Sequence, residues 1–535
     1  MYYKQVFYLK KIVFRCLIIT VIFGLNIFTF SAYGQKGDKV THSGIIIPDV
    51  FDRRYLAMDQ TLHSELKNLQ MVMGQAGNHK MIFERFDDRW LETCNIDGYE
   101  YICGVFRDHE GRFRMYYNVA QPALRTSKMR TKEAMAVAFS DDEVNWIRPA
   151  LNIAPALVDH PSSNLINIES HPGMDDGYWY RCGPIFYDEF APVESRYKLS
   201  WRVNNDTYVA TSSDGLNFIT HGLAIHYKAD TQHAAFYDYL KGEYVMYGRK
   251  RGDWETGPAD RRGVSRHSSR NWTDIPWTNV GQVVIDPMDV WDYSTGIWPQ
   301  VYTPAIQIYH GQYIGLPSIF YTDSKRIPVS HPDRITGPMF PMVMYSHDGI
   351  QWSFPDLKHS IVDLKPHERV STYEHASYKG KEVGMVTTAT NFIEAGDSLY
   401  IYYTVRESNH YEQEPLDNKS VHVAFMRVDG FASIQTQGNG KGEWITTDIK
   451  VPEGAGNLIV NANIKGNLHV EVLDAVKGKP INGLALANST GVKGDKTNFK
   501  VEWKNGAFKN AAGKNVRFRF VLEDGAIYSF SFQPR

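Results

Sequence analysis

The sequence reads SSDGLNF at residues 212–218, and the same pattern returns as SDDEVNW at 140–146 and SHDGIQW at 346–352. A degenerate fourth copy, RHSSRNW, occupies residues 266–272. The Ser-x-Asp-Gly segment is typical of a turn after a strand, because Asp caps such turns and glycine accepts a positive φ, and the aromatic residue packs the next strand back. Copies that start 72, 54 and 80 residues apart are typical of successive blades, so the pattern predicts a β-propeller.

A second repeated element, a strand followed by a polar turn and a Tyr-rich strand, predicts the number of blades. It occurs five times, at residues 106–117, 186–201, 236–247, 305–320 and 392–403. Long helical periodicity is absent between these copies, which disfavours a parallel α/β fold. The sequence therefore predicts an all-β chain with a five-bladed propeller, and residues 59–73 are its best candidate for a helix.

The sequence pattern changes near residue 429. From there to residue 535, short runs of alternating apolar and polar residues are separated by Gly-rich turns. A stretch of this length is typical of a separate antiparallel β-sandwich. We therefore expect the propeller to cover residues 35–428 and a C-terminal β-sandwich to cover residues 429–535.

Residues 1–34 have the features of a secretory signal peptide. They contain four basic and no acidic side chains, and an apolar stretch at 16–32 precedes Gly34 and Gln35. We expect cleavage near Gly34–Gln35 and an exported protein, periplasmic or extracellular. An uncleaved membrane anchor is the alternative, although the stretch is at the lower edge of the length that spans a bilayer. No other segment has the length and apolarity of a span, so no membrane span is expected after cleavage.

Composition and cysteine content narrow the possible partners. The chain has 58 Lys+Arg against 60 Asp+Glu, a net charge of −2, which argues against a nucleic-acid binder. Cys94, Cys103 and Cys182 remain after cleavage, and both a Cys94–Cys103 disulfide and three buried thiols are open. No spacing indicates a zinc site, a phosphate-binding Gly-rich loop or a Gly-x-Ser-x-Gly elbow, so no metal and no cofactor are predicted.

The layout of a five-bladed propeller followed by a β-sandwich resembles that of the family 32 glycoside hydrolases, and the propeller alone resembles family 43. More closely, the chain is similar to a group of secreted bacterial proteins described as glycosyl hydrolase family 32-like. This resemblance covers nearly the whole mature chain and implies a glycosidase. The residues that carry it are 101–117, 230–232, 236–238, 242–247 and 396–403 in the propeller, and 429–431, 470–474, 494–495 and 516–520 in the C-terminal part.

Glycoside hydrolysis requires two carboxyl groups on opposite sides of a sugar. The innermost strands of a propeller surround a funnel, so carboxylates at the starts of these strands converge. The candidates by position are Glu92 and Asp97 in blade 1, Asp175 and Asp176 in blade 2, Asp230 in blade 3, Asp292 in blade 4, and Glu374 and Glu382, with His375 nearby, in blade 5.

The resemblance implies roles for three of these positions. Blade 1 supplies an Asp nucleophile or base, which fits Asp97, and blade 2 supplies an Asp that positions the substrate, which fits Asp176. Blade 3 supplies a Glu acid, but this chain has Asp230 there and lacks a Trp-Met-Asn-Asp-Pro-like nucleophile motif. Asp230 is therefore one candidate for the acid, and Glu92 and Glu382 are the alternatives.

A second set of residues is predicted to contact the substrate: Asp292, Arg262, Trp298, Glu382 and His375. Arg262 belongs to an Arg-rich stretch, which either holds a carboxylate or sulfate of an anionic polysaccharide or pairs with acids of its own loop. Trp298 either stacks on a sugar face or packs in a blade core.

The sequence thus predicts an exported glycoside hydrolase that acts on a plant or algal polysaccharide or oligosaccharide, with an anionic carbohydrate as one alternative. A non-catalytic carbohydrate-binding propeller is the second hypothesis, because the blade-3 Glu is absent. Fold alone does not choose between the two. No oligomeric state is predicted.

Overall fold

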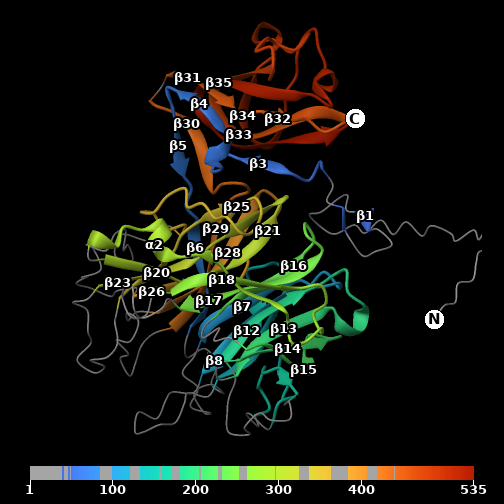
Figure 1. The fold of residues 1–535 in the computed structure, drawn as a ribbon, viewed down its shortest axis with the longest axis vertical. Coiled ribbons are helices and arrows are strands. Elements are labelled where there is room, and N and C mark those ends of the chain that lie inside the picture. The colour runs from blue at the N-terminus through green and yellow to red at the C-terminus, as the bar shows by residue number, and fades with distance from the viewer. Residues whose placement is uncertain are drawn as a thin grey trace, which may run out of the picture.

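The computed structural model shows a nearly all-β protein, with a β-propeller and a C-terminal sheet stacked along the long axis (Figure 1). The only α-helix among the described residues is α2 (Pro287–Val290), and no helix in this part of the chain is long and apolar enough to cross a membrane. The described residues are 39–40, 46–47, 50–84, 99–120, 133–155, 160–169, 181–203, 206–226, 232–251, 262–295, 297–323, 337–362, 384–406, 419–438 and 440–535.

Three blades of the propeller are separate sheets. The first contains β7 (Tyr99–Arg107), β8 (Phe113–Ala120), β9 (Glu133–Ser140) and β10 (Trp146–Ile147). The second contains β11 (Asn167–Ile168), β12 (Arg181–Tyr187), β13 (Tyr197–Val203), β14 (Asp206–Ser212) and β15 (Asn217–Ile225). The third contains β16 (Ala234–Asp238), β17 (Glu243–Arg251), β18 (Arg262–Ser269) and β19 (Asn279–Ile285).

The fourth blade is an eight-stranded sheet, and the prediction of five blades is therefore wrong: the described strands form four. Its members are β20 (Ile297–Thr303), β23 (Ser318–Asp323), β24 (Met339–Pro341), β26 (Met385–Thr388), β27 (Ile393–Ala395), β28 (Ser398–Arg406), β29 (Lys419–Arg427) and β6 (Gly77–Glu84). A separate three-stranded sheet contains β21 (Ile306–Tyr309), β22 (Gln312–Gly315) and β25 (Met344–Ser346).

Proline explains why the expected fourth blade is divided. Pro304 follows β20 and Pro317 precedes β23, and a proline donates no hydrogen bond to a strand ladder. One half of the expected blade becomes the small three-stranded sheet. The other half merges with the expected fifth blade where Met339 pairs in parallel with Met385.

The repeated Ser-x-Asp-Gly segments are turns, as predicted. Asp214 shows the geometry: its Oδ1 accepts hydrogen bonds from the backbone N–H groups of Leu216 at 2.7 Å and Asn217 at 2.8 Å. Asp142 and Asp348 accept the equivalent pairs of bonds. The residues at the fourth position have positive φ in all three copies: Glu143 at 64°, Gly215 at 72° and Gly349 at 66°.

These turns also connect neighbouring sheets, which the sequence pattern alone did not indicate. The carbonyl oxygen of the positive-φ residue accepts a hydrogen bond from a buried tyrosine on another sheet. The three bonds are Tyr116 to Gly215 at 2.9 Å, Tyr247 to Gly349 at 2.9 Å and Tyr402 to Glu143 at 2.6 Å. The motif therefore acts both within a sheet and between sheets.

Replacing Tyr247 by phenylalanine is expected to lower the free energy of unfolding by about 1–3 kcal/mol, because the buried Gly349 carbonyl would lose its donor. Urea unfolding of the variant and the wild type measures the difference. Tyr400→Phe is the matched control, since the Tyr400 hydroxyl makes no hydrogen bond to a described residue and its ring is only half-buried. Equal stability of the two variants would refute the role of this bond between sheets.

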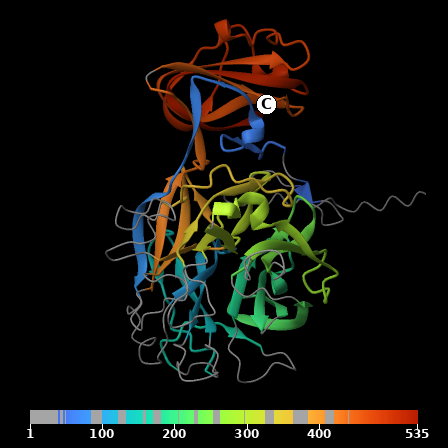
Figure 2. The same cartoon turned by 60° about the vertical axis from the view of Figure 1, so that its left-hand side comes forward.

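The C-terminal strands form one nine-stranded sheet, so the predicted two-sheet sandwich is not confirmed. Three strands from the N-terminal part belong to this sheet, which Figure 2 shows as blue strands beside the orange and red ones. The members are β3 (Arg54–Leu56), β4 (His63–Lys67), β5 (Leu69–Met73), β30 (Ala432–Thr436), β31 (Lys441–Thr446), β32 (Ile449–Lys450), β33 (Ala455–Asp474), β34 (Val492–Lys500) and β35 (Asn515–Pro534).

The helix expected over residues 59–73 is absent, because this segment contributes strands to the C-terminal sheet. Residues Gln60–Leu62 form a single 3-10 turn, and β4 and β5 then pair with β31 and β30. Asn68, between the two strands, takes a φ of 55°, which ends any regular helical path. Pairing with strands more than 350 residues away overrides the local helical preference.

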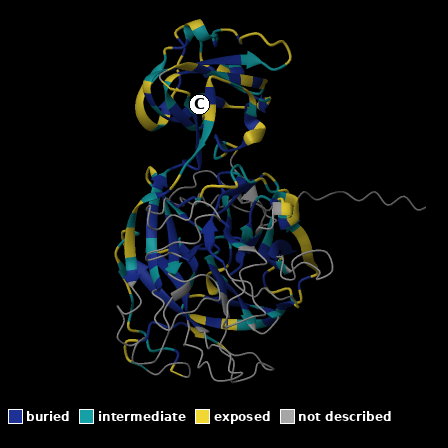
Figure 3. Ribbon diagram, turned by 90° about the vertical axis from the view of Figure 1, so that its left-hand side faces the viewer, coloured by how far each residue is buried: buried dark blue, intermediate teal, exposed yellow. Residues whose placement is uncertain are grey.

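Buried residues are numerous in both the propeller and the C-terminal sheet, as the dark blue ribbon of Figure 3 shows. In the sheet, the Trp444 ring stacks on Phe520 with centroids 5.0 Å apart. In the propeller, Cys103 is buried near the carbonyl oxygen of Tyr101. Cys103 is a free thiol in this structure, which favours the buried-thiol alternative over a Cys94–Cys103 disulfide, and Cys94 itself lies outside the described residues.

Candidate functional site

Residues from different blades meet where β7 and β16 begin, beside the second half of β20, and we call this region the strand-start end. The hydroxyls of Tyr101 and Tyr302 lie 3.5 Å apart there, although 201 residues separate them in the chain. Gln232, just before β16, donates a hydrogen bond from its Nε2 to the carbonyl oxygen of Ile102 in β7. The strand-start end therefore gathers side chains from three blades.

Two buried arginines face the ring of Tyr302. The guanidinium carbon of Arg249 lies 4.6 Å from the ring centroid and that of Arg262 lies 5.7 Å from it. Arg262 Nη1 also donates to Gln300 Oε1 at 2.7 Å, and its backbone N–H reaches the same oxygen at 3.3 Å. Guanidinium groups over an aromatic ring keep their donors in one plane, an arrangement suited to hydroxyl or carboxylate oxygens.

Two buried amide side chains at this end each have one atom engaged and the other unpaired. Gln300 Oε1 accepts from Arg262, whereas its Nε2 has no hydrogen-bond partner among the described residues. Gln232 donates through Nε2, whereas its Oε1 has no described partner. Unpaired buried polar atoms are uncommon in native proteins, so one free donor and one free acceptor mark this end as a place for a polar ligand or water.

The four side chains predicted for catalysis and two of the predicted substrate contacts fall outside the described residues. These are Glu92, Asp97, Asp176, Asp230, His375 and Glu382. Their positions in the site therefore remain predictions.

The other predicted substrate contacts, Arg262, Trp298 and Asp292, are described. Arg262 is 2% exposed and belongs to the strand-start end. Trp298 is half-buried on β20, two residues before Gln300 and thus on the same face of the strand. Asp292 is exposed and accepts a hydrogen bond from the Ser294 N–H at 2.9 Å; hydrogen bonds from Ser294 lower its pKa. Its described contacts place it as a turn cap rather than beside Tyr302.

Sequence reasoning missed Gln232, Gln300, Tyr101 and Tyr302 as members of this site. A sequence signal was present for Gln300 and Tyr302. They lie two and four residues after the predicted contact Trp298, and alternate residues of a strand lie on the same face. No local signal marks Gln232, whose role depends on a contact with a residue 130 positions away.

A cavity of about 410 Å³ is lined by residues that lie further along the chain in these strands, among them the last residues of β7 and β12. Its walls include Phe106, Tyr187, Tyr237, Asn391 and Glu394. Asn391 is held by both backbone polar groups of Val105, and Glu394 is held by Arg54 and His310. Glu394 is the only carboxylate among the described residues that line the cavity, so these residues do not supply the acid pair that glycoside hydrolysis needs.

No protein-family model and no curated protein matches the sequence. Among solved structures, the chain is similar to a glycosyl hydrolase from Bacteroides ovatus, with 13% identity, a TM-score of 0.38, and coverage of 69% of this chain and 97% of the other. It is also similar to a Bombyx mori GH32 beta-fructofuranosidase, with 10% identity, a TM-score of 0.36, and coverage of 88% and 94%. An N-acetylgalactosamine deacetylase from F. plautii gives 12% identity, a TM-score of 0.36, and coverage of 71% and 94%. Similarities at this level assign neither a family nor an activity.

Proposed function

We propose that the protein is a glycosidase whose active site lies at the strand-start end of the propeller. The hydrogen bond from Gln232 to the Ile102 carbonyl carries this proposal, because it joins the two chain segments that follow candidate acids. Asp230 precedes Gln232 by two residues. Asp97 precedes Ile102 by five residues. The proposal is that this contact brings the two carboxyl groups to one site, because hydrolysis of a glycosidic bond requires two carboxyl groups beside that bond.

In this proposal the two acids have different roles. Asp230 protonates the glycosidic oxygen as the bond to the leaving sugar breaks, and Asp97 attacks the anomeric carbon or activates a water that attacks it. Asp176 orients the substrate. Glu92 and Glu382 are the alternatives for the acid.

The described part of the strand-start end supports a carbohydrate as the substrate. The free Gln300 Nε2 and Gln232 Oε1 offer a donor and an acceptor for sugar hydroxyls. Trp298 lies on the same face of β20 as Gln300 and offers a ring surface. Arg249 and Arg262 favour substrates that carry a carboxylate or sulfate over neutral ones.

The test is a screen of the protein from Gln35 onward, the amino terminus that we propose for the exported form. Neutral, uronate-containing and sulfated plant and algal glycans are incubated with it, and reducing ends and glycan binding are both measured. Hydrolysis that is lost in Asp176→Asn, Asp97→Asn or Asp230→Asn is the expected result. Binding without hydrolysis would replace the glycosidase with a carbohydrate-binding propeller, and the absence of both across the panel would contradict a carbohydrate function for this site.

A further inference from the structure

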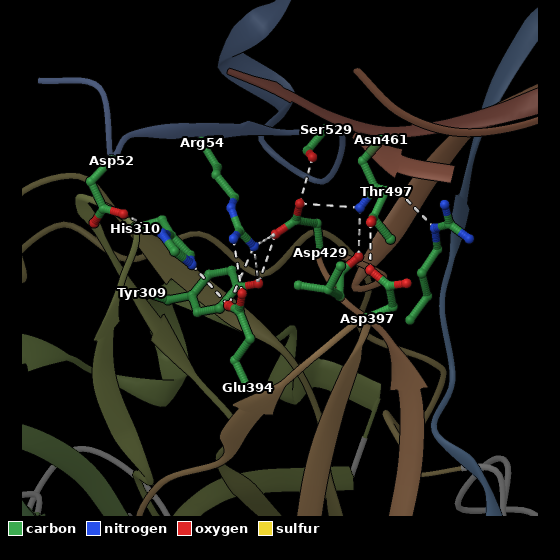
Figure 4. Close-up of polar contacts among 12 residues, drawn as sticks. Asp52, Arg54, Tyr309, His310, Glu394, Asp397, Asp429, Asn461, Thr497 and Ser529 are labelled. Atoms are coloured by element: carbon green, nitrogen blue, oxygen red, sulfur yellow. Dashed lines mark hydrogen bonds and ion pairs between the residues drawn. The ribbon is translucent and has the colours of Figure 1, made fainter. Parts of the chain in front are cut away.

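A histidine between two carboxylates lies where the propeller meets the C-terminal sheet. His310 is in the turn between β21 and β22, with Nδ1 2.9 Å from Asp52 Oδ1 and Nε2 2.8 Å from Glu394 Oε2 (Figure 4). The His310 side chain is only 7% exposed. A carboxylate oxygen accepts hydrogen bonds, whereas a neutral imidazole has a single N–H. Only the doubly protonated ring satisfies both contacts.

Asp52 belongs to the segment that leads into β3, a strand of the C-terminal sheet, whereas Glu394 is on β27 of the propeller. His310 therefore bridges the two parts of the molecule with its two ring nitrogens. We propose that His310 is a positively charged clasp that holds residues 50–56, and through them the C-terminal sheet, on the propeller, and that the clasp opens when His310 loses a proton at alkaline pH.

The charges around His310 explain why this proton matters. Arg54 Nη2 lies 2.8 Å from Glu394 Oε1, and Arg54 Nη1 lies 2.9 Å from Asp429 Oδ1. Two cations, His310 and Arg54, thus face three carboxylates in one cluster. His310 and Asp429 are buried, and the side chains of the other three residues are 19–24% exposed. If His310 were neutral, Arg54 would be the one positive charge in this cluster to balance the three carboxylates.

Neutral groups complete the cluster and fix the orientation of Asp429. The Tyr309 hydroxyl donates to Asp429 Oδ1 at 2.7 Å, and the Tyr309 ring packs edge-on against the His310 ring with centroids 4.6 Å apart. Ser529 of β35 and Asn461 of β33 donate to Asp429 Oδ2 at 2.6 Å and 3.2 Å. The cluster therefore connects the propeller to two central strands of the C-terminal sheet as well as to β3 (Figure 4).

The pKa directions agree with this geometry. Burial by itself would lower the pKa of His310, but the hydrogen bonds to Asp52 and Glu394 outweigh it and raise the pKa to about 9. Burial would raise the pKa of Glu394 and of Asp429, but the neighbouring cations and hydrogen bonds lower both. Because the folded pKa of His310 exceeds its unfolded value of about 6.5, its contribution is complete below that pH and is lost as pH rises to 9.

The first test measures the proton directly in the wild-type protein. Histidine ring nitrogens are labelled with nitrogen-15, and the His310 signal is identified by its absence in His310→Gln. The expected result is a doubly protonated His310 ring at pH 7 that titrates near pH 9. A ring that is neutral at pH 7 would overturn the proposal.

The second test measures attachment by hydrogen exchange of residues 50–56 at pH 6.5 and pH 9.5, after correction for the intrinsic rate. In the wild type, protection is expected to fall on the order of 100-fold over this interval, since each pKa unit is a tenfold change in the equilibrium. In His310→Gln the fall is expected to disappear. His359→Gln, which removes an exposed histidine paired with Asp356, is the matched control and should behave as the wild type. An equal fall in His310→Gln and wild type would overturn the clasp.

Discussion

Replacing Gly74 by alanine is expected to lower the free energy of unfolding by about 3 kcal/mol or more, among the largest effects of any single methyl group in this protein. A Cβ atom at this position would lie 1.7 Å from the carbonyl oxygen of Gly430 and 2.9 Å from its carbonyl carbon. Both are backbone atoms, so no side-chain rotation relieves the overlap.

Gly74 is critical because it lies where a two-stranded ribbon passes from the C-terminal sheet into the propeller. On one side of it β5 pairs with β30, with Met73 opposite Ala432. On the other side β6 pairs with β29, with Gly77 opposite Phe425. The Gly74 N–H donates to the Phe431 carbonyl at 2.9 Å in between. Forcing the chains apart here would disturb both the closure of the propeller and the C-terminal sheet.

Gly77→Ala is the matched control, because a Cβ atom there meets nothing within 4 Å. Denaturant unfolding of Gly74→Ala, Gly77→Ala and the wild type gives the comparison, provided that the slopes with denaturant stay equal. If both variants had the stability of the wild type, the close approach of Gly74 to Gly430 would not exist in solution.

The parts of the fold that were predictable from sequence depend on local chemistry. Asp214 and its equivalents cap their turns through backbone groups two and three residues away, so a seven-residue pattern contains all the information needed to recognise them. The blade count failed because the partner of a strand is not a local property. Nothing near Met339 in the sequence indicates that it pairs with Met385 in parallel.

The same distinction separates what was found and missed in the candidate site. Arg262 and Trp298 were recognisable because an Arg-rich stretch and a tryptophan at a strand start are conspicuous by residue type. Gln300 and Gln232 were missed because a glutamine becomes informative only when burial leaves half of its amide unpaired, and burial depends on the packing of distant strands. The cluster of five charged residues around His310 was invisible for the same reason, since its members lie at positions 52, 54, 310, 394 and 429.

The second large effect concerns catalysis, and this prediction rests on the proposed function. On a glycan identified by the screen, Asp97→Asn and Asp230→Asn are each expected to lower kcat by about 10²–10⁴-fold, the range that a positioned acid or base contributes. Asparagine keeps the size of the side chain but neither supplies a proton nor acts as a nucleophile. Asp448→Asn is the control, since this exposed acid pairs with Arg517 in the C-terminal sheet and loses the same charge far from the strand-start end.

The two variants should differ in how they respond to the leaving group. A substrate whose aglycone departs without protonation removes the need for an acid, so it should restore much of the activity of Asp230→Asn and little of that of Asp97→Asn. The reverse order would exchange the two roles. If both variants stay within tenfold of the wild type, the same comparison with Glu92→Gln and Glu382→Gln decides whether the acid lies on another blade. Retained activity in all four variants would rule out the carboxylate mechanism at the strand-start end. Loss of activity in one of them would identify the acid and therefore the blade that supplies it.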